Sequence, residues 1–230
     1  MKTIVRKLLR RFGYDLVGFK HVDGRPNPLR PWEEDPECLR VCQSAIPHTL
    51  VDRQRLYMLY QLARKASRLD GALAECGVYK GGTALLLCQC KPRDKTLYLF
   101  DTFEGMPDVD AKLDIHRAGD LADTSLAKVQ QLLAGQPAVV FRQGRFPATA
   151  AGIEAERFCF VHVDVDIYQS VIDCCDFFEP RLVPGGVMVF DDYGFLSTPG
   201  AKAAVEHYCR QRNLAEIYLP TGQALLVKTV

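Results

Sequence analysis

Apolar residues recur with two different periods along this chain, and the order of those periods predicts its fold. Over residues 52–69, apolar side chains such as Leu56 and Ala63 return at helical spacing, and Thr49 or Asp52 can cap the start of that helix. Short apolar runs typical of β-strands then alternate with helical stretches. The strand-like runs cover residues 72–78, 96–101, 138–143, 158–165, 186–191, 214–219 and 223–227. This alternation predicts an α/β fold with helices on both faces of a mostly parallel, seven-stranded sheet.

The connection between the two last strand-like runs sets the direction of the final strand. Only Pro220, Thr221 and Gly222 join these runs. Such a link is too short for the helical crossover between parallel strands, but it suits a hairpin. We therefore expect the last strand to be antiparallel.

The segment before the alternating pattern has a different character. Residues 1–12 alternate apolar and basic side chains and predict an amphipathic helix, whereas residues 24–38 contain four prolines and predict an irregular arm. We expect residues 1–45 to form this helix and arm, and residues 46–230 to form one domain. The basic helix could lie on a membrane surface, pack on its own domain or contact a second subunit. We expect a homodimer formed through this N-terminal region.

A polar stretch interrupts the alternation in the middle of the chain. Residues 105–124 lack a clear period, and a helical pattern follows over residues 125–133. Long irregular segments inside a compact domain are commonly lids over active sites. We therefore expect a mobile lid over residues 105–124.

Composition narrows the class of protein. The 230 residues carry a net charge of +1, and 48% of them are hydrophobic, as in an ordinary globular domain. The lysines and arginines form no basic stripe, which argues against nucleic acid as a partner. No apolar run approaches the roughly 20 residues that a membrane-spanning helix needs. The sequence indicates a protein that acts on a small molecule.

Cysteine usage favours a reducing compartment. The nine cysteines are an odd number, and no secretory signal precedes them. The close pairs Cys38 with Cys42 and Cys88 with Cys90 lack a second pair at the spacing of a zinc site. We therefore expect buried free thiols and a cytoplasmic location.

A glycine turn after the first strand of the alternating region predicts a nucleotide-type site. Gly77, Gly81 and Gly82 follow the strand and open a helix whose free amides favour an anionic group. Their spacing differs from the G-x-G-x-x-G fingerprint of dinucleotide-binding proteins. The acid before the turn, Glu75, suits the ammonium group of an amino acid, and Asp101 at the end of the next strand suits ribose hydroxyls. Either acid could instead be a helix cap or a surface charge.

Carboxylates follow two later strands and predict a metal site. Asp164 and Asp166 end one run, while Asp191 and Asp192 end the next, so in a parallel sheet all four lie at the edge of the glycine turn. Converging carboxylates repel one another unless a cation or protons compensate, and oxygen ligands select Mg²⁺ or a similar hard ion. We expect Asp164, Asp191 and Asp192 to hold the metal. Asp166 is the first candidate for the base that deprotonates a hydroxyl group, and His162 the second.

In these residues the chain resembles the macrocin O-methyltransferase family of class I methyltransferases, which is of the TylF and MycF type. The resemblance covers about residues 46–230 and rests on motifs in a fixed order. These motifs are Arg55-Leu56, residues 75–82 (ECGVYKGG), 101–107 (DTFEGMP), 144–149 (GRFPAT), 162–168 (HVDVDIY), 184–186 (PGG) and 191–194 (DDYG). Two residues depart from the family pattern, since Tyr79 and Arg145 stand where tryptophan is usual.

The resemblance implies a function and a set of binding residues. It implies S-adenosylmethionine as methyl donor, Mg²⁺ on Asp164, Asp191 and Asp192, Asp166 as base, and a sugar hydroxyl of a natural product as acceptor. The residues that it implies around the cofactor are Thr49, Leu50, Glu75, Gly77, Tyr79, Gly81, Gly82, Thr83, Asp101, Thr102, Phe103, Ser125, Gly144, Arg145, Phe146 and Asp164. Two alternatives remain at this point. One is a nicotinamide-dependent oxidoreductase, which the glycine spacing disfavours, and the other is a non-catalytic subunit that binds S-adenosylmethionine.

Overall fold

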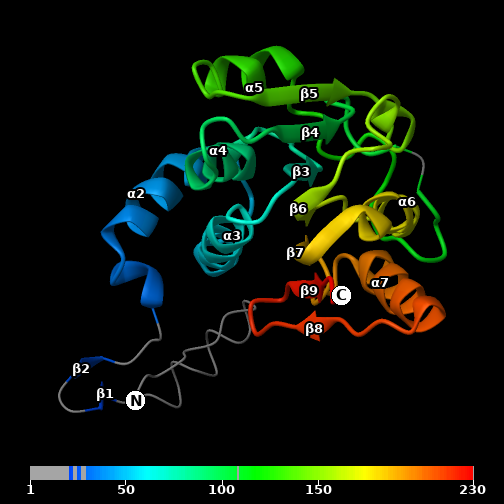
Figure 1. Cartoon of the computed structure of the whole chain (residues 1–230). Coiled ribbons are helices and arrows are strands. Elements are labelled where there is room, and N and C mark those ends of the chain that lie inside the picture. Colours follow the sequence, from blue (N-terminus) through cyan, green and yellow to red (C-terminus); the bar gives the residue numbers. More distant parts are fainter. Residues whose placement is uncertain (1–20, 23–24, 27–29, 108, 230) are drawn as a thin grey trace.

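The computed structural model describes residues 21–22, 25–26, 30–107 and 109–229, and its main feature is one seven-stranded sheet. The strand order is β5-β4-β3-β6-β7-β9-β8 (Figure 1). The strands are β3 (Ala72–Cys76), β4 (Leu97–Asp101), β5 (Val139–Gln143), β6 (Phe158–Val163), β7 (Leu182–Phe190), β8 (Ile217–Tyr218) and β9 (Ala224–Val227). The seven strands expected from the apolar runs are all present.

The direction of the strands also agrees with the sequence prediction. The pairs between β5, β4, β3, β6 and β7 are parallel, whereas β9 pairs antiparallel with both β7 and β8. The parallel strands end at one edge of the sheet, which brings together the turn after β3 and the acids after β6 and β7. The α/β fold with an antiparallel last strand is therefore confirmed.

Helices cover both faces of the sheet (Figure 1). One face packs against α2 (Pro36–Ala45), α3 (Arg53–Ala66), α4 (Gly82–Cys90) and α5 (Leu126–Leu132), and the other against α6 (Tyr168–Phe178) and α7 (Pro199–Arg212). Short 3₁₀ turns lie at Pro31–Glu33, Ile46–His48, Ala148–Ala150 and Glu179–Arg181. Asp52 caps α3, since its carboxylate accepts hydrogen bonds from the amides of Gln54 and Arg55.

Helix α2 lies where the sequence predicted part of an irregular arm. Pro36 occupies the first turn of the helix, where its missing N–H is not needed, and the Asp35 carboxylate accepts hydrogen bonds from the next amides. Cys38, Val41, Cys42 and Ala45 are buried in the core with α3 and α4. Of the four prolines from which the arm was predicted, Pro36 therefore marks the start of a helix and not a loop. The domain boundary between residues 45 and 46 stays a prediction.

The arm before α2 contains a short antiparallel pair, β1 (His21–Val22) with β2 (Arg25–Pro26). The helix expected over residues 1–12, and the dimer contacts expected from it, lie outside the described residues. All nine cysteines lie within the described part of the chain, and each is a buried free thiol, as expected.

Candidate active site

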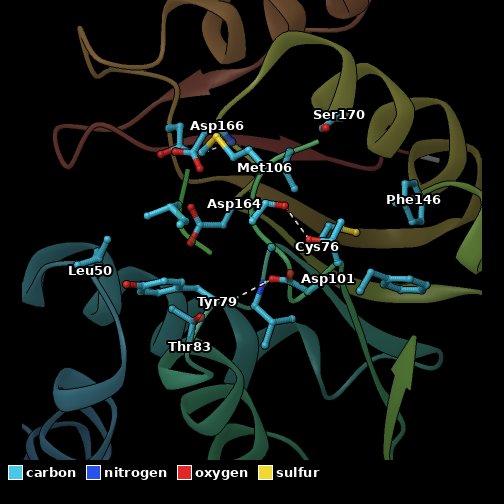
Figure 2. A pocket seen from close by; sticks show the side chains of 18 of the residues that line it. Leu50, Cys76, Tyr79, Thr83, Asp101, Met106, Phe146, Asp164, Asp166 and Ser170 are labelled. Atoms are coloured by element: carbon cyan, nitrogen blue, oxygen red, sulfur yellow. Dashed lines mark hydrogen bonds between the residues drawn. The ribbon is translucent and has the colours of Figure 1, made fainter. Parts of the chain in front are cut away.

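A cavity of about 280 Å³ opens at the carboxyl edge of the parallel strands (Figure 2). The turn after β3 and the end of β4 form one wall, and the residues after β6 and β7 form another. The lid expected over residues 105–124 contributes Gly105, Met106, Pro107, Leu121 and Thr124, and the segment 49–51 also lines the cavity. The cavity therefore touches both motif groups that the sequence singled out.

The glycine turn is fixed by close approach to the neighbouring strand. Gly77 has a φ of +84°, and a Cβ atom built on it would lie only 1.7 Å from the carbonyl oxygen of Asp164. The Asp164 amide also donates a 2.9 Å hydrogen bond to the Cys76 carbonyl. Only glycine fits this position. The turn after β3 is therefore packed directly against Asp164, the first residue of the acid cluster (Asp164, Asp166, Asp191 and Asp192).

The Asp101 carboxylate organises the same turn. Its Oδ2 accepts hydrogen bonds from the amides of Val78 (2.7 Å) and Tyr79 (2.8 Å), and its Oδ1 accepts one from the Phe103 amide (2.6 Å). Asp101 also lines the cavity, so its outer lone pairs can accept hydrogen bonds from a ligand hydroxyl.

Most residues expected around a cofactor gather on this cavity. Those that line it are Thr49, Leu50, Gly77, Tyr79, Thr83, Asp101, Thr102, Gly144, Arg145, Phe146 and Asp164. The others, Glu75, Gly81, Gly82, Phe103 and Ser125, do not. Gly82 instead packs against the backbone of α2 and the turn after it, because an added Cβ would lie 2.6 Å from the Ala45 carbonyl oxygen. A role in cofactor binding stays a prediction for the whole set.

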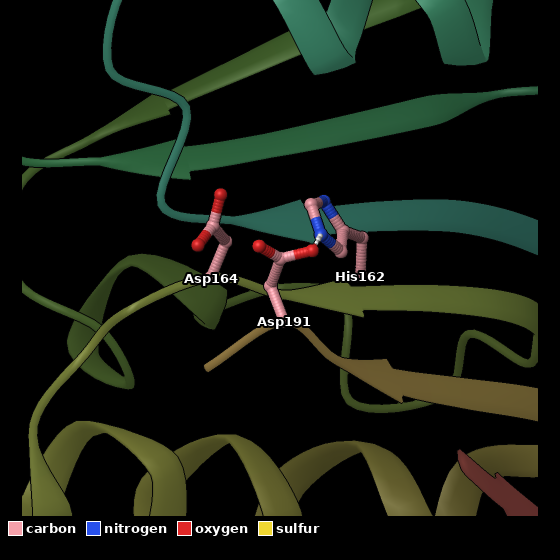
Figure 3. Close-up of side chains that lie close together, drawn as sticks. All are labelled: His162, Asp164 and Asp191. Carbon is pink, nitrogen blue, oxygen red and sulfur yellow. Dashed lines mark hydrogen bonds and ion pairs between the residues drawn. The ribbon is translucent and has the colours of Figure 1, made fainter. Parts of the chain in front are cut away.

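Two of the three predicted metal ligands line the cavity, and the third lies behind them. Asp164 and Asp192 line it, together with Asp166, whereas Asp191 is fully buried behind them. Ligand atoms of Asp164, Asp191 and His162 lie within 4.8 Å of one another, a group that has His162 in the place of the predicted ligand Asp192 (Figure 3). Asp166 adopts a left-handed φ of +59°, and its amide donates a 3.3 Å hydrogen bond to Asp192.

His162 is held between two buried carboxylates. Its Nδ1 lies 2.8 Å from Glu75 Oε1, and its Nε2 lies 3.5 Å from Asp191 Oδ1. All three side chains are fully buried, and Glu75 and His162 face each other in the register of β3 and β6. His162 does not line the cavity, so the structure gives it no contact with an acceptor in this arrangement.

Arg55 and Gln223 complete the surroundings of Asp191. The Arg55 guanidinium forms an ion pair with Asp191 Oδ2 and lies 4.7 Å above the Phe195 ring. The Gln223 amide donates a 2.8 Å hydrogen bond to Asp191 Oδ1. The sequence marked Arg55 only as part of a family motif and gave no sign of Gln223, because these contacts join residues far apart in the chain.

The carboxyl groups of the cluster differ in the direction in which their pKa values are shifted. Burial raises the pKa of Asp164 and of Asp192 well above the usual range, and the neighbouring carboxylates raise both further. Burial opposes ionisation of Asp191 as well, but the hydrogen bond from His162 and the charges of His162 and Arg55 outweigh it and lower its pKa. Burial lowers the pKa of His162, yet its bonds to Asp191 and Glu75 prevail and raise it to about 10.

The donor set suits a hard divalent cation. Burial and the neighbouring carboxylates favour the protonated forms of Asp164 and Asp192, and a divalent cation would compensate the negative charges of their ionised forms. Both ring nitrogens of His162 already face carboxylates, which makes oxygen donors the fitting ligands. The arrangement is compatible with Mg²⁺ on Asp164, Asp191 and Asp192.

The segment 105–124, which the sequence predicts to be a lid, forms several hydrogen bonds with the rest of the molecule. The Tyr79 hydroxyl donates a 2.7 Å hydrogen bond to Asp123, the Thr124 hydroxyl donates one to the Tyr79 carbonyl, and Asp114 accepts one of 2.9 Å from the Tyr168 amide. Between these attachments, His116 Nε2 lies 3.9 Å from Asp166 Oδ1. Residues 105–124 therefore border both the glycine turn and the candidate base.

The sequence matches the family described as Macrocin-O-methyltransferase (TylF) over residues 37–219. The chain belongs to this family. It is an O-methyltransferase that depends on S-adenosylmethionine (SAM). A nicotinamide-dependent oxidoreductase is thereby excluded.

Named members and solved structures agree with this membership. The chain is 30% identical over 192 residues to mycinamicin III 3''-O-methyltransferase of Micromonospora griseorubida, a match that covers 74% of each chain. It is 30% identical over 190 residues, covering 74% of this chain and 70% of the relative, to 8-demethyl-8-(2,3-dimethoxy-alpha-L-rhamnosyl)-tetracenomycin-C 4'-O-methyltransferase of Streptomyces olivaceus. The solved O-methyltransferase NovP has a TM-score of 0.69 and 27% identity, with 80% of this chain and 83% of NovP covered. Among the described residues, each helix is too short or too polar to cross a bilayer.

Proposed function

We propose that this enzyme transfers the SAM methyl group to a hydroxyl on the sugar of a glycosylated natural product, with a divalent cation held by Asp164, Asp191 and Asp192. The observation that carries the proposal is the single cavity that borders both the glycine turn and the acid cluster. The relatives support the acceptor class, because one is named for a mycinamicin and another for a tetracenomycin that carries a rhamnosyl group.

At the donor end, the proposal assigns the ribose hydroxyls to Asp101. The turn from Gly77 to Tyr79 presents its backbone to the cavity, and Thr83 lies at the start of α4, where a hydroxyl and the helix amides suit a carboxylate. Residues 49–51 and 144–146 enclose the remaining surface. These side chains and backbone groups position the methyl carbon and exclude water from it.

At the acceptor end, Asp166 takes the proton. Asp164, Asp191 and Asp192 would hold a divalent cation, which would lower the pKa of an acceptor hydroxyl and offset the developing negative charge. As the acceptor O–H bond breaks, its proton moves to the Asp166 carboxylate, and the oxygen attacks the sulfonium methyl carbon. The new O–C bond forms while the C–S bond breaks, and its electron pair stays on the neutral sulfur of S-adenosylhomocysteine.

The test measures methyl transfer to a panel of glycosylated natural products and their sugar-free cores, with and without EDTA. We expect transfer to glycosylated acceptors, loss with EDTA, recovery with Mg²⁺, and strong loss in Asp192→Asn. Asp94→Asn, a change in the exposed loop before β4, is the control and should behave like the unaltered enzyme. Full turnover in metal-free buffer would refute the metal role. Methylation of sugar-free cores alone would refute the acceptor class, and tight cofactor binding without methylation of any acceptor would favour a non-catalytic subunit.

A further inference from the structure

Four charged or ionisable side chains form a continuous run next to the cavity, and two of them, Glu75 and His162, have no part in the steps above. The run crosses the sheet from Glu75 on β3 to His162 on β6 and Asp191 after β7, and it ends at Arg55 on α3. Polar side chains in a core carry a large desolvation cost, so a run of them on adjacent strands requires an explanation.

We propose that Glu75 and His162 are positioning residues that act on methyl transfer through Asp191 and make no contact with the cofactor. The inference rests on the proposed role of Asp191 as a metal ligand. It differs from the sequence expectation, which assigned Glu75 to the cofactor ammonium group and His162 to proton transfer.

The location of Glu75 and His162 separates them from both ligands. Both side chains are fully buried, and neither lines the cavity. Residues 73 and 75 of β3 point to the face covered by α2, α3 and α4, since strand residues alternate, and Leu73 belongs to the core on that face. The glycine turn begins only beyond this strand. A cofactor seated on the turn therefore meets its backbone and not the Glu75 carboxylate.

The contacts of His162 are those expected of a residue that orients the Asp191 carboxylate. With Glu75 Oε1 2.8 Å from Nδ1, the ring plane is set, and Nε2 is directed at Asp191 Oδ1. The Gln223 amide reaches the same oxygen at 2.8 Å, while Arg55 pairs with Oδ2. The carboxylate is thus held at both oxygens. Partners behind a metal ligand of this kind typically change metal affinity by roughly 10- to 100-fold when removed.

The Glu75 carboxylate has a hydrogen-bond partner at one of its two oxygens. Within the described residues its Oε2 is buried without a hydrogen-bond partner, whereas Oε1 contacts His162. A fold that only needed to fill this space would use an apolar residue, as at Leu73. The contact with His162 is therefore the feature of Glu75 that accounts for its presence.

The experiment compares cation and cofactor affinity in the full chain by calorimetry. Mn²⁺ is titrated as the metal probe, and S-adenosylhomocysteine is titrated separately in EDTA. In Glu75→Gln and His162→Gln we expect Mn²⁺ affinity to fall by roughly 10- to 100-fold, and S-adenosylhomocysteine affinity to change by less than about twofold. The double variant should resemble the single ones, because both act through Asp191.

Two controls separate positioning from general damage. Val161→Ala changes the neighbour of His162 that points into the opposite core, so it should lower the melting temperature without weakening Mn²⁺ binding. Asp164→Asn tests the metal site itself. If Asp164→Asn leaves Mn²⁺ binding intact, the metal role in the proposed function fails.

If Asp164→Asn weakens Mn²⁺ binding but Glu75→Gln and His162→Gln do not, the positioning role alone is overturned. A loss of S-adenosylhomocysteine affinity in Glu75→Gln, with Mn²⁺ binding unchanged, would also overturn the positioning role and would show that Glu75 binds the cofactor. If Glu75→Gln does not fold, the Mn²⁺ affinity of His162→Gln alone decides whether the positioning role holds.

Discussion

Gly77 and Asp164 approach so closely that a single added methyl group on Gly77 would overlap the Asp164 carbonyl oxygen, at 1.7 Å. Gly77→Ala should therefore displace the strand end that carries the acid cluster. We expect it to lower the free energy of unfolding by roughly 3 kcal/mol or more, since overlap adds to an unfavourable positive φ. Urea unfolding measures this loss. Gly135→Ala is the matched control, because Gly135 has a φ of +83° with no described atom within 4 Å of an added Cβ, and it should lose only about 1 kcal/mol.

Asp101→Asn should weaken cofactor binding. The substitution replaces a carboxylate that accepts three backbone hydrogen bonds and faces the cavity by an amide that can accept with one oxygen only. Loss of hydrogen bonds to a charged group corresponds to roughly 2 kcal/mol, or about 30-fold in the dissociation constant of S-adenosylhomocysteine. Calorimetry checks the value, and Asp94→Asn should leave it unchanged. Equal affinity in Asp101→Asn would contradict the ribose assignment.

Tyr79→Phe should loosen residues 105–124, the segment predicted to be a lid. The variant keeps the ring and removes the hydroxyl that donates to Asp123. We expect the KM for the acceptor to rise by about fivefold, which corresponds to roughly 1 kcal/mol for one exposed hydrogen bond, with kcat nearly unchanged. Faster amide hydrogen exchange over residues 105–124 would accompany it. Tyr57→Phe, which removes a hydroxyl from α3, is the control, and an unchanged exchange rate in Tyr79→Phe would argue against the attachment.

Asp166→Asn should remove the proton acceptor. We expect kcat to fall by roughly 10²- to 10⁴-fold, the usual contribution of a positioned base, while S-adenosylhomocysteine affinity stays within about twofold. Steady-state kinetics and calorimetry measure the two quantities. His207→Asn on the exposed part of α7 serves as the control. Retention of kcat would show that another group takes the proton.

Stability without a divalent cation should fall as the pH rises. The raised pKa values of Asp164 and Asp192 mean that the folded state holds protons that the unfolded state releases above about pH 4, and stability is lost in that direction. The pKa of His162 near 10 adds a contribution that is complete below about pH 6.5 and lost as the pH rises toward 10. Asp191, with its lowered pKa, adds stability above about pH 4 that stays constant at higher pH.

Melting temperatures recorded between about pH 6 and about pH 9 test this expectation. The increase in melting temperature on adding Mg²⁺ should be larger at alkaline pH, because Mg²⁺ competes with protons for Asp164 and Asp192. The combined variant Asp164→Asn with Asp192→Asn should show neither the Mg²⁺ effect nor its pH dependence. A Mg²⁺ effect that is independent of pH would contradict the raised pKa values of these two acids.

The sheet could be predicted because periodicity is a local property. Each strand carries its own apolar run, and the short link at Pro220 to Gly222 fixes the direction of the last strand. The strand ends were less accurate. The run at 158–165 continues in sequence beyond Val163, where β6 stops, because the residues after it turn away, with Asp166 at a left-handed φ.

Contacts between distant residues were beyond the reach of sequence patterns. The acids after β6 and β7 could be placed together by the rule that parallel strands end at one edge, yet that rule does not say which acid is buried. The pairing of Arg55 with Asp191, 136 residues away, and the register that sets Glu75 opposite His162 depend on packing across the sheet. Helix α2 was missed because Pro36 resembles a breaker, although the first turn of a helix accepts proline.

The cavity has walls of two kinds, and this difference bears on how the enzyme's range of acceptors can diversify. Gly77, Asp101 and Asp164 stand at the ends of paired strands, where a neighbouring backbone fixes each position. The other wall consists of connecting segments, namely residues 105–124, residues 49–51 and the loop with Phe195. Connecting segments tolerate insertions and substitutions better than strands do. Specificity for a new acceptor can therefore arise by substitution in these connecting segments, while the residues at the strand ends that face the methyl donor stay the same.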